Sequence, residues 1–129
     1  LSAYGEYDCL GHIDLIKRHL VRCGFPVEYE RYESYIDQIL KNVISRGKGI
    51  EVNTSGIRQG AGEPMPGLRT LKRYKELGGE IVTVGSDSHK PADVAADFEE
   101  AAKLLVQAGF DHVTAYERRR PVPGCNLIK

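Results

Sequence analysis

Short apolar segments that end in polar residues alternate along this chain with longer segments whose apolar residues recur at helical spacing. The clearest short segment is the β-branched run Ile81-Val82-Thr83-Val84, which is typical of a buried strand. Segments of this kind predict strands over residues 7–10, 49–53, 80–84 and 112–116. Segments with helical spacing predict helices over residues 13–20, 33–46, 68–77 and about 92–108. The inner face of the last helix is expected to carry Val94, Phe98, Ala101, Leu105 and Ala108.

Alternating strands and helices predict an α/β fold, with a mostly parallel sheet that is covered by helices. The sheet could be a closed barrel or an open doubly wound sheet, and in both cases binding groups gather at the carboxyl ends of the strands. Three polar clusters lie at such positions: Gly11-His12, Asn53-Thr54-Ser55 and Asp87-Ser88-His89. The residues after position 116 are expected to form a basic, proline-containing tail.

Asp87 and His89 are the strongest candidates for chemistry. In an extended backbone, residues i and i+2 point to the same side, so the Asp87 carboxylate and the His89 imidazole can converge on one point. Oxygen and nitrogen donors held in this way suit a divalent metal ion in a hydrolytic site. The alternative is an ordinary loop in which Asp87 caps the next helix and His89 is solvated.

Composition narrows the possible functions. The chain has 18 Lys and Arg residues against 18 Asp and Glu residues. This balance argues against a broad nucleic-acid surface or an anionic-membrane surface. Its apolar runs are all much shorter than the ~20 residues of a membrane span. The three widely spaced cysteines form neither a disulfide framework nor a thiolate metal site, so a reducing cytoplasm is expected.

Three motifs together carry a resemblance to a known family. The segments 11–18 (GHIDLIKR), 49–56 (GIEVNTSG) and 85–89 (GSDSH) resemble the C-terminal motifs of the PHP (polymerase and histidinol phosphatase) family, in its histidinol-phosphatase branch. The resemblance implies a distorted (β/α)7 barrel with two or three metal ions at the carboxyl ends of its strands. It implies that His12, Asp87 and His89 are catalytic metal ligands, and that Arg18 and Arg58 bind the substrate phosphate.

The chain also departs from the family pattern. The family's N-terminal His-x-His motif is absent, and so are the next histidine and the bridging glutamate, since the only histidines are His12, His19, His89 and His112. Residues 1–129 therefore resemble the C-terminal half of a single barrel domain whose N-terminal half is missing. The start at Leu1 is consistent with a larger parent chain, and this chain alone is expected to bind one metal ion or none.

The function implied by the resemblance is metal-dependent hydrolysis of a phosphate monoester, L-histidinol phosphate in histidine biosynthesis, by the intact barrel. A metal ion lowers the pKa of bound water to about 7, and mixed nitrogen and oxygen ligands suit Zn, Fe or Mn without separating them. Arginines match phosphate oxygens bidentately. One alternative is a related PHP phosphoesterase. Another is a non-catalytic half-barrel that associates through unpaired strand edges with another copy or with its missing half.

Several candidates have simpler interpretations. Arg18 follows Asp14 by four residues, so the two could form an ordinary helix-surface ion pair. Asn53 and Ser55 could shape a turn instead of a site, and Glu51 shares a face with Asn53 without being expected as a ligand. The remaining polar residues are expected to be structural or solvated: His19, His112 and the run Arg118-Arg119-Arg120.

Overall fold

The computed structural model describes residues 4–128, so Leu1 lies outside the described part of the chain. The strands are β1 (Cys9–Leu10), β2 (Gly49–Asn53), β3 (Val82–Gly85), β4 (His112–Glu117) and β5 (Arg120–Asn126). The helices are α1 (Ile16–Arg22), α2 (Glu33–Ser45), α3 (Ser55–Arg58), α4 (Leu68–Glu76) and α5 (Phe98–Gln107). Short 3₁₀ turns cover Tyr29–Arg31 and Pro91–Asp93.

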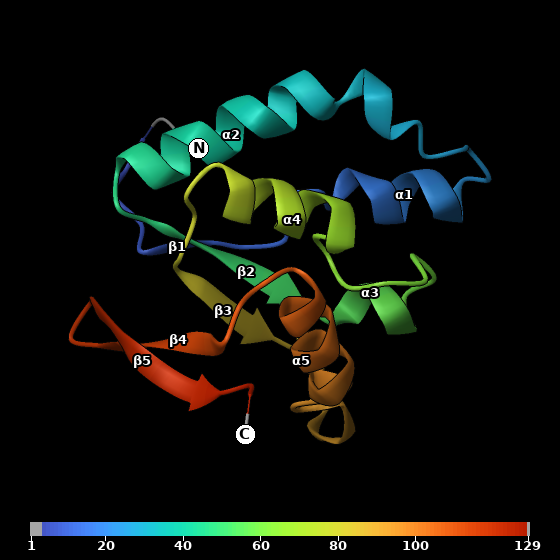
Figure 1. Cartoon of the computed structure of the whole chain (residues 1–129). Helices are drawn as coiled ribbons and strands as arrows, with labels where there is room; N and C mark the ends of the chain where they lie inside the picture. The colour runs from blue at the N-terminus through green and yellow to red at the C-terminus, as the bar shows by residue number, and fades with distance from the viewer. Residues whose placement is uncertain (1–3, 129) are drawn as a thin grey trace.

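A parallel sheet in the order β1-β2-β3 organises the fold, as the alternation of elements predicted. Helices α2 and α4 contact each other and cover one face of this sheet (Figure 1). Ile50 and Val52 on β2 are fully buried beneath that layer, and so is Leu40 on α2. The arrowheads of β2 and β3 point toward the side where α1 and α3 lie (Figure 1). The polar residues that follow the strands therefore gather on that side.

The predicted helix over residues 92–108 is wrong in its first half. Ala95 and Asp97 adopt left-handed backbone conformations, with φ of 57° and 61°, and α5 begins only at Phe98. Ala96 O accepts a hydrogen bond from Thr54 Oγ1 at 2.7 Å, so contacts from another element override the local helical pattern. Val94 is consequently 66% exposed instead of lying on an inner face. Phe98 is also partly exposed, whereas Ala101, Leu105 and Ala108 are buried as predicted.

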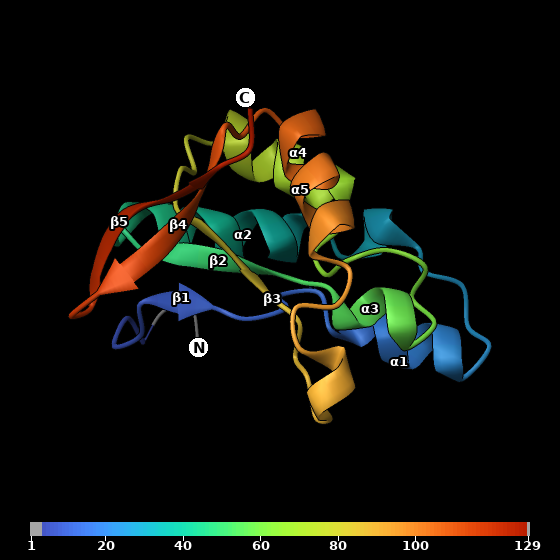
Figure 2. The same cartoon turned by 90° about the horizontal axis from the view of Figure 1, so that it is seen from below.

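The C-terminal segment is a strand and not the expected tail. β5 pairs antiparallel with β4, and the turn between them places Arg118 and Arg119 at φ of 48° and 66°. Two successive positive φ values are the conformation that a two-residue hairpin turn requires. The hairpin lies on the opposite side of the molecule from α1 and α3 (Figure 2). Within residues 4–128, β4 therefore does not extend the parallel sheet, although it contacts β3. The same residues contain no helix that is long and apolar enough to cross a membrane.

The packing of α2 against the sheet is expected to dominate stability. Leu40 has no exposed surface, so Leu40→Ala should lower the free energy of unfolding by about 2–5 kcal/mol, through lost burial and the cavity left behind. Gln38→Ala changes an exposed position of the same helix and should stay within about 0.5 kcal/mol of the wild type. Urea unfolding of both variants measures the difference. Equal stability of the two variants would contradict this account of the core.

Candidate functional site

The candidate site lies at the carboxyl edge of the parallel sheet. Asn53 at the end of β2 is in register with Gly85 at the end of β3. Thr54 N donates to Gly85 O at 2.8 Å, which extends this pairing one residue past β2. The loops that follow these two strands therefore start side by side. The resulting surface takes its side chains from segments that are far apart in the sequence.

Asp87 is the centre of the site because its carboxylate faces three other side chains. Its Oδ1 lies 3.5 Å from His89 Nε2, so the two predicted side chains lie close together, although the extended backbone on which that prediction relied is not present at Asp87. Its Oδ2 lies 3.9 Å from Arg18 Nη1 and 3.4 Å from Ser55 Oγ. Asp87 reaches this position with a left-handed backbone, at φ of 48°. Aspartate tolerates that conformation better than most residues.

Within residues 4–128, His12 does not complete a three-ligand metal site with this pair. Its backbone is also left-handed, with φ of 24°, and its carbonyl accepts a hydrogen bond from Leu15 N in the turn before α1. Across residues 4–128, no three His, Cys, Asp or Glu side chains are placed to hold one metal ion. The expected convergence of His12, Asp87 and His89 on one cation is therefore not seen in this structure. The Asp87–His89 pair has suitable oxygen and nitrogen donors, but two side chains do not make a complete metal site.

Arg18 points toward Asp87 and not toward Asp14. Asp14 precedes the first residue of α1 and pairs with Lys17, so the structure does not show the i, i+4 helix pair with Arg18 that was the alternative interpretation. The Arg18 side chain is only 15% exposed, and its Nε is buried without a hydrogen-bond partner among the described residues. At 3.9 Å, its contact with Asp87 is an ion pair and not a hydrogen bond. The guanidinium therefore has unused capacity to bind an anion.

Arg58 lies on α3, a single short helix that follows β2. Its Nη2 donates to Ser86 O at 2.6 Å, and its Nη1 donates to Asp97 Oδ2 at 3.2 Å. Its Nε lies 3.9 Å from Asp93 Oδ1. Arg58 thus ties α3 to the connection between β3 and α5, directly beside Asp87. The partners Asp93 and Asp97 could not be identified from the sequence pattern, because both fall in a segment that was predicted as helix.

A buried hydrogen-bond network supports the loop after β2. Asn53 is 2% exposed, and its Oδ1 accepts hydrogen bonds from Ser55 Oγ at 2.6 Å and from Ser55 N at 3.0 Å. Its Nδ2 donates to Glu51 Oε2 at 3.2 Å. A Cβ at Gly85 would overlap the Glu51 carboxylate, and one at Gly11 would lie 3.3 Å from Glu51 Oε2. The two glycines therefore make room for Glu51, and Asn53 shapes the turn that presents Ser55 to Asp87.

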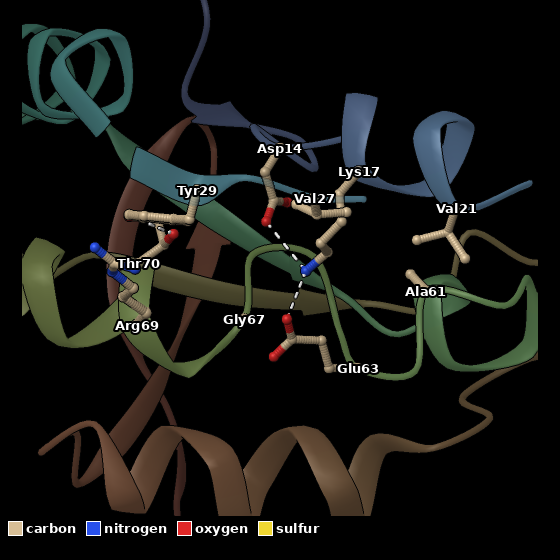
Figure 3. A pocket seen from close by; sticks show the side chains of 10 residues that line it. All are labelled: Asp14, Lys17, Val21, Val27, Tyr29, Ala61, Glu63, Gly67, Arg69 and Thr70. Atoms are coloured by element: carbon tan, nitrogen blue, oxygen red, sulfur yellow. Dashed lines mark hydrogen bonds and ion pairs between the residues drawn. The ribbon is translucent and has the colours of Figure 1, made fainter. Parts of the chain in front are cut away.

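A second polar cluster lies beside the site, at a hollow of about 320 Å³ between α1 and the segment before α4 (Figure 3). Lys17 is 8% exposed, and its Nζ lies 2.9 Å from Glu63 Oε1 and 3.3 Å from Asp14 Oδ2. It also donates to Pro64 O at 3.4 Å. The cluster fixes the loop after α3 against α1, the helix that carries Arg18. It joins residues 46 positions apart, which no local sequence pattern indicates.

Asp14 is the member of this cluster whose carboxylate is incompletely paired. Its Oδ1 is buried and has no hydrogen-bond partner within the described part of the chain. Burial raises the pKa of the Asp14 carboxyl, and the neighbouring Lys17 ammonium offsets only part of that effect. The folded state therefore holds the Asp14 proton more tightly than the unfolded state does. The contribution of Asp14 to stability should accordingly decrease as the pH rises from 4 to 7.

Asp14→Asn removes this titration. The free energy of unfolding of the variant, relative to that of the wild type, should be higher at pH 7 than at pH 4, because only the wild type must ionise a buried carboxyl. Denaturant unfolding at both pH values gives the comparison. An exposed carboxylate elsewhere serves as the control: Glu99→Gln should show no such change between the two pH values. An advantage of Asp14→Asn that is larger at pH 4 would contradict the assigned direction.

Comparison with known proteins gives relatives of one kind. No family model matches the chain. The sequence is 40% identical over 120 residues to a probable histidinol-phosphatase of Clostridium acetobutylicum, a match that covers 92% of this chain and 46% of that protein. It is 27% identical over 108 residues to a probable histidinol-phosphatase of Thermotoga maritima, covering 84% of this chain and 44% of the relative. The chain thus spans about half the length of these relatives.

A solved structure shows the same fold. The crystal structure of histidinol phosphate phosphatase from Lactococcus lactis, in complex with zinc, L-histidinol and phosphate, matches with a TM-score of 0.71 at 21% sequence identity. The match covers 92% of this chain and 45% of that protein. Over nearly its whole length, the chain therefore folds like a little under half of that phosphatase.

Proposed function

We propose that this chain is the C-terminal half of a PHP-type (β/α)7 barrel that hydrolyses a phosphate monoester, L-histidinol phosphate in histidine biosynthesis, in the cytoplasm. The observation that carries the proposal is the placement of Asp87 between His89 and Arg18 at the carboxyl edge of the sheet. The relatives support the same reaction, because those compared above are named histidinol-phosphatases. Their length, about twice that of this chain, supports the half-barrel interpretation.

Arg18 is proposed to bind the substrate phosphate. Its guanidinium is largely buried and makes no hydrogen bond to Asp87, and its Nε–H has no hydrogen-bond partner within residues 4–128. A phosphate dianion can accept two guanidinium hydrogens in the paired geometry that arginine favours. Arg58 contributes a second positive charge from α3, and Ser86 O and Asp97 hold it in place. Together the two arginines would neutralise charge on the phosphate as the ester bond breaks.

A divalent metal ion, Zn, Fe or Mn, is proposed as the cofactor, with two or three ions in the intact barrel and one or none in this chain. His12, Asp87 and His89 would supply part of the ligand set, and the remaining ligands would come from the other half of the barrel. The zinc in the Lactococcus lactis structure supports this choice of cofactor. Bound there, the metal would lower the pKa of water and stabilise charge on the phosphate. His89 is free to reorient toward a metal, since its side chain is 81% exposed.

The hydrolytic role of Asp87 can be tested in the intact barrel by measuring phosphate release from L-histidinol phosphate. Asp87→Asn keeps the shape of the side chain but removes its charge, and should lower kcat by at least about a hundredfold. Asp111→Asn alters an exposed aspartate just before β4 and should leave kcat unchanged. Unchanged turnover by Asp87→Asn would remove Asp87 from the mechanism. Hydrolysis of other phosphate monoesters but not of histidinol phosphate would instead favour a related phosphoesterase.

The phosphate-binding role of Arg18 can be tested on this chain alone. Arg18→Lys retains the positive charge but loses the paired hydrogen bonds, so the affinity for inorganic phosphate should fall about tenfold. Arg22→Lys changes an exposed arginine in the last turn of the same helix and should have no effect. Phosphate titrations followed by NMR would measure both. Equal affinities of the two variants would show that Arg18 does not bind the phosphate.

A further inference from the structure

The carboxylate of Asp97 binds an arginine instead of capping the helix that follows it. It is the residue that precedes the first turn of α5, where an aspartate side chain normally accepts hydrogen bonds from the helix N–H groups. The Asp97 side chain makes no such capping bond. Its Oδ2 instead accepts a hydrogen bond from Arg58 Nη1 at 3.2 Å. The Asp97 carboxylate therefore contacts an arginine of the candidate site and does not cap α5.

The backbone around Asp97 is held in place from two directions. Thr54, which is fully buried, donates from Oγ1 to Ala96 O at 2.7 Å. Ser86 Oγ accepts a hydrogen bond from Ala95 N at 3.2 Å. Both Ala95 and Asp97 have left-handed backbones, a conformation that costs free energy and persists only where the surroundings enforce it. Asp97 is therefore a fixed support against which the longer, more flexible Arg58 side chain can be ordered.

The Arg58 guanidinium makes two hydrogen bonds and keeps other N–H groups for further acceptors. Ser86 O takes one hydrogen from Nη2 at 2.6 Å, and Asp97 takes one from Nη1. Each of these nitrogens carries two hydrogens, so one on each remains for a further acceptor. The contact of Nε with Asp93 Oδ1, at 3.9 Å, is too long to be a hydrogen bond. The two short contacts fix the plane of the guanidinium without using all of its donors.

We propose that Asp97 is a positioning residue that fixes the orientation of the Arg58 guanidinium, so that Arg58 meets the substrate phosphate already ordered. This inference rests on the proposed function, in which Arg58 binds phosphate. Asp97 itself does not touch the substrate. The benefit is entropic, because a side chain that is ordered beforehand loses less freedom when the anion binds.

Two substitutions separate the carboxylate contact from the backbone conformation. Asp97→Gly removes the side chain, and glycine adopts left-handed backbone freely, so the loop keeps its conformation. Asp97→Asn also tolerates that conformation and keeps an oxygen that can accept from Arg58, while it removes the negative charge. Glu99→Gln removes a negative charge two residues away and controls for electrostatics alone. Thermal unfolding of each variant establishes that it is folded.

The first measurement reports the orientation of Arg58 directly. In the ¹⁵N NMR spectrum of a rigidly held arginine, the two Nη atoms give separate signals, and fast rotation merges them. We expect separate Arg58 signals in the wild type, in Asp97→Asn and in Glu99→Gln, and merged signals in Asp97→Gly. Separate signals in Asp97→Gly would overturn the proposal, whatever the phosphate titration gives.

The second measurement is the affinity for inorganic phosphate. Asp97→Gly should bind it about tenfold more weakly than the wild type, the equivalent of ~1.4 kcal/mol. Asp97→Asn and Glu99→Gln should bind it at least as tightly as the wild type. Equal or tighter binding by Asp97→Gly would overturn the proposal, because Asp97 would then compete with phosphate for Arg58. If the wild type binds no phosphate while the Arg58 signals merge in Asp97→Gly, Asp97 does orient Arg58, and the proposed phosphate-binding function is what fails.

Discussion

The parallel pairing of β2 with both of its neighbours is the constraint on which the candidate site depends. β1 and β3 flank β2 in register, so the loops that leave their carboxyl ends emerge on one side of the sheet. This arrangement brings Arg18, from the helix after β1, to Asp87, from the loop after β3. Residues 69 positions apart in the sequence thereby become neighbours. The apolar packing of Ile50 and Val52 against α2 and α4 holds the strands in that register.

Around this edge, buried and half-buried polar groups connect the loops to one another. Asn53 orders the turn after β2, Lys17 ties the loop after α3 to α1, and Arg58 ties α3 to the connection before α5. Buried polar groups are favourable only when they are paired, so each of these ties specifies one loop conformation over others. Asp14 shows the cost, since one of its oxygens is buried without a partner among residues 4–128. This unpaired oxygen lies just before α1, the helix that carries Arg18.

The sequence predicted the elements that depend on local periodicity and burial. The parallel strands and the helices at 33–46 and 68–77 form close to the expected bounds, because the apolar spacing matches the face that each buries. It also anticipated the proximity of Asp87 and His89, but for the wrong reason, because Asp87 has a left-handed backbone and not the extended one that the prediction assumed. The helix at 92–108 was predicted too long, since hydrogen bonds that Thr54 donates to Ala96 O and Ser86 accepts from Ala95 N decide the conformation of residues 95–96. The partners of Arg58 were missed for the same reason, and the metal-ligand role of His12 stays a prediction.

A crystal structure of the intact barrel grown with Mn²⁺ and phosphate, with the metal located by its anomalous scattering, would show whether Asp87 and His89 hold a metal beside Arg18. We expect a metal ion bound by the Asp87 carboxylate and the His89 imidazole, with a phosphate oxygen on the guanidinium of Arg18. A metal bound elsewhere, with Asp87 still paired to Arg18 and no phosphate between the arginines, would contradict it.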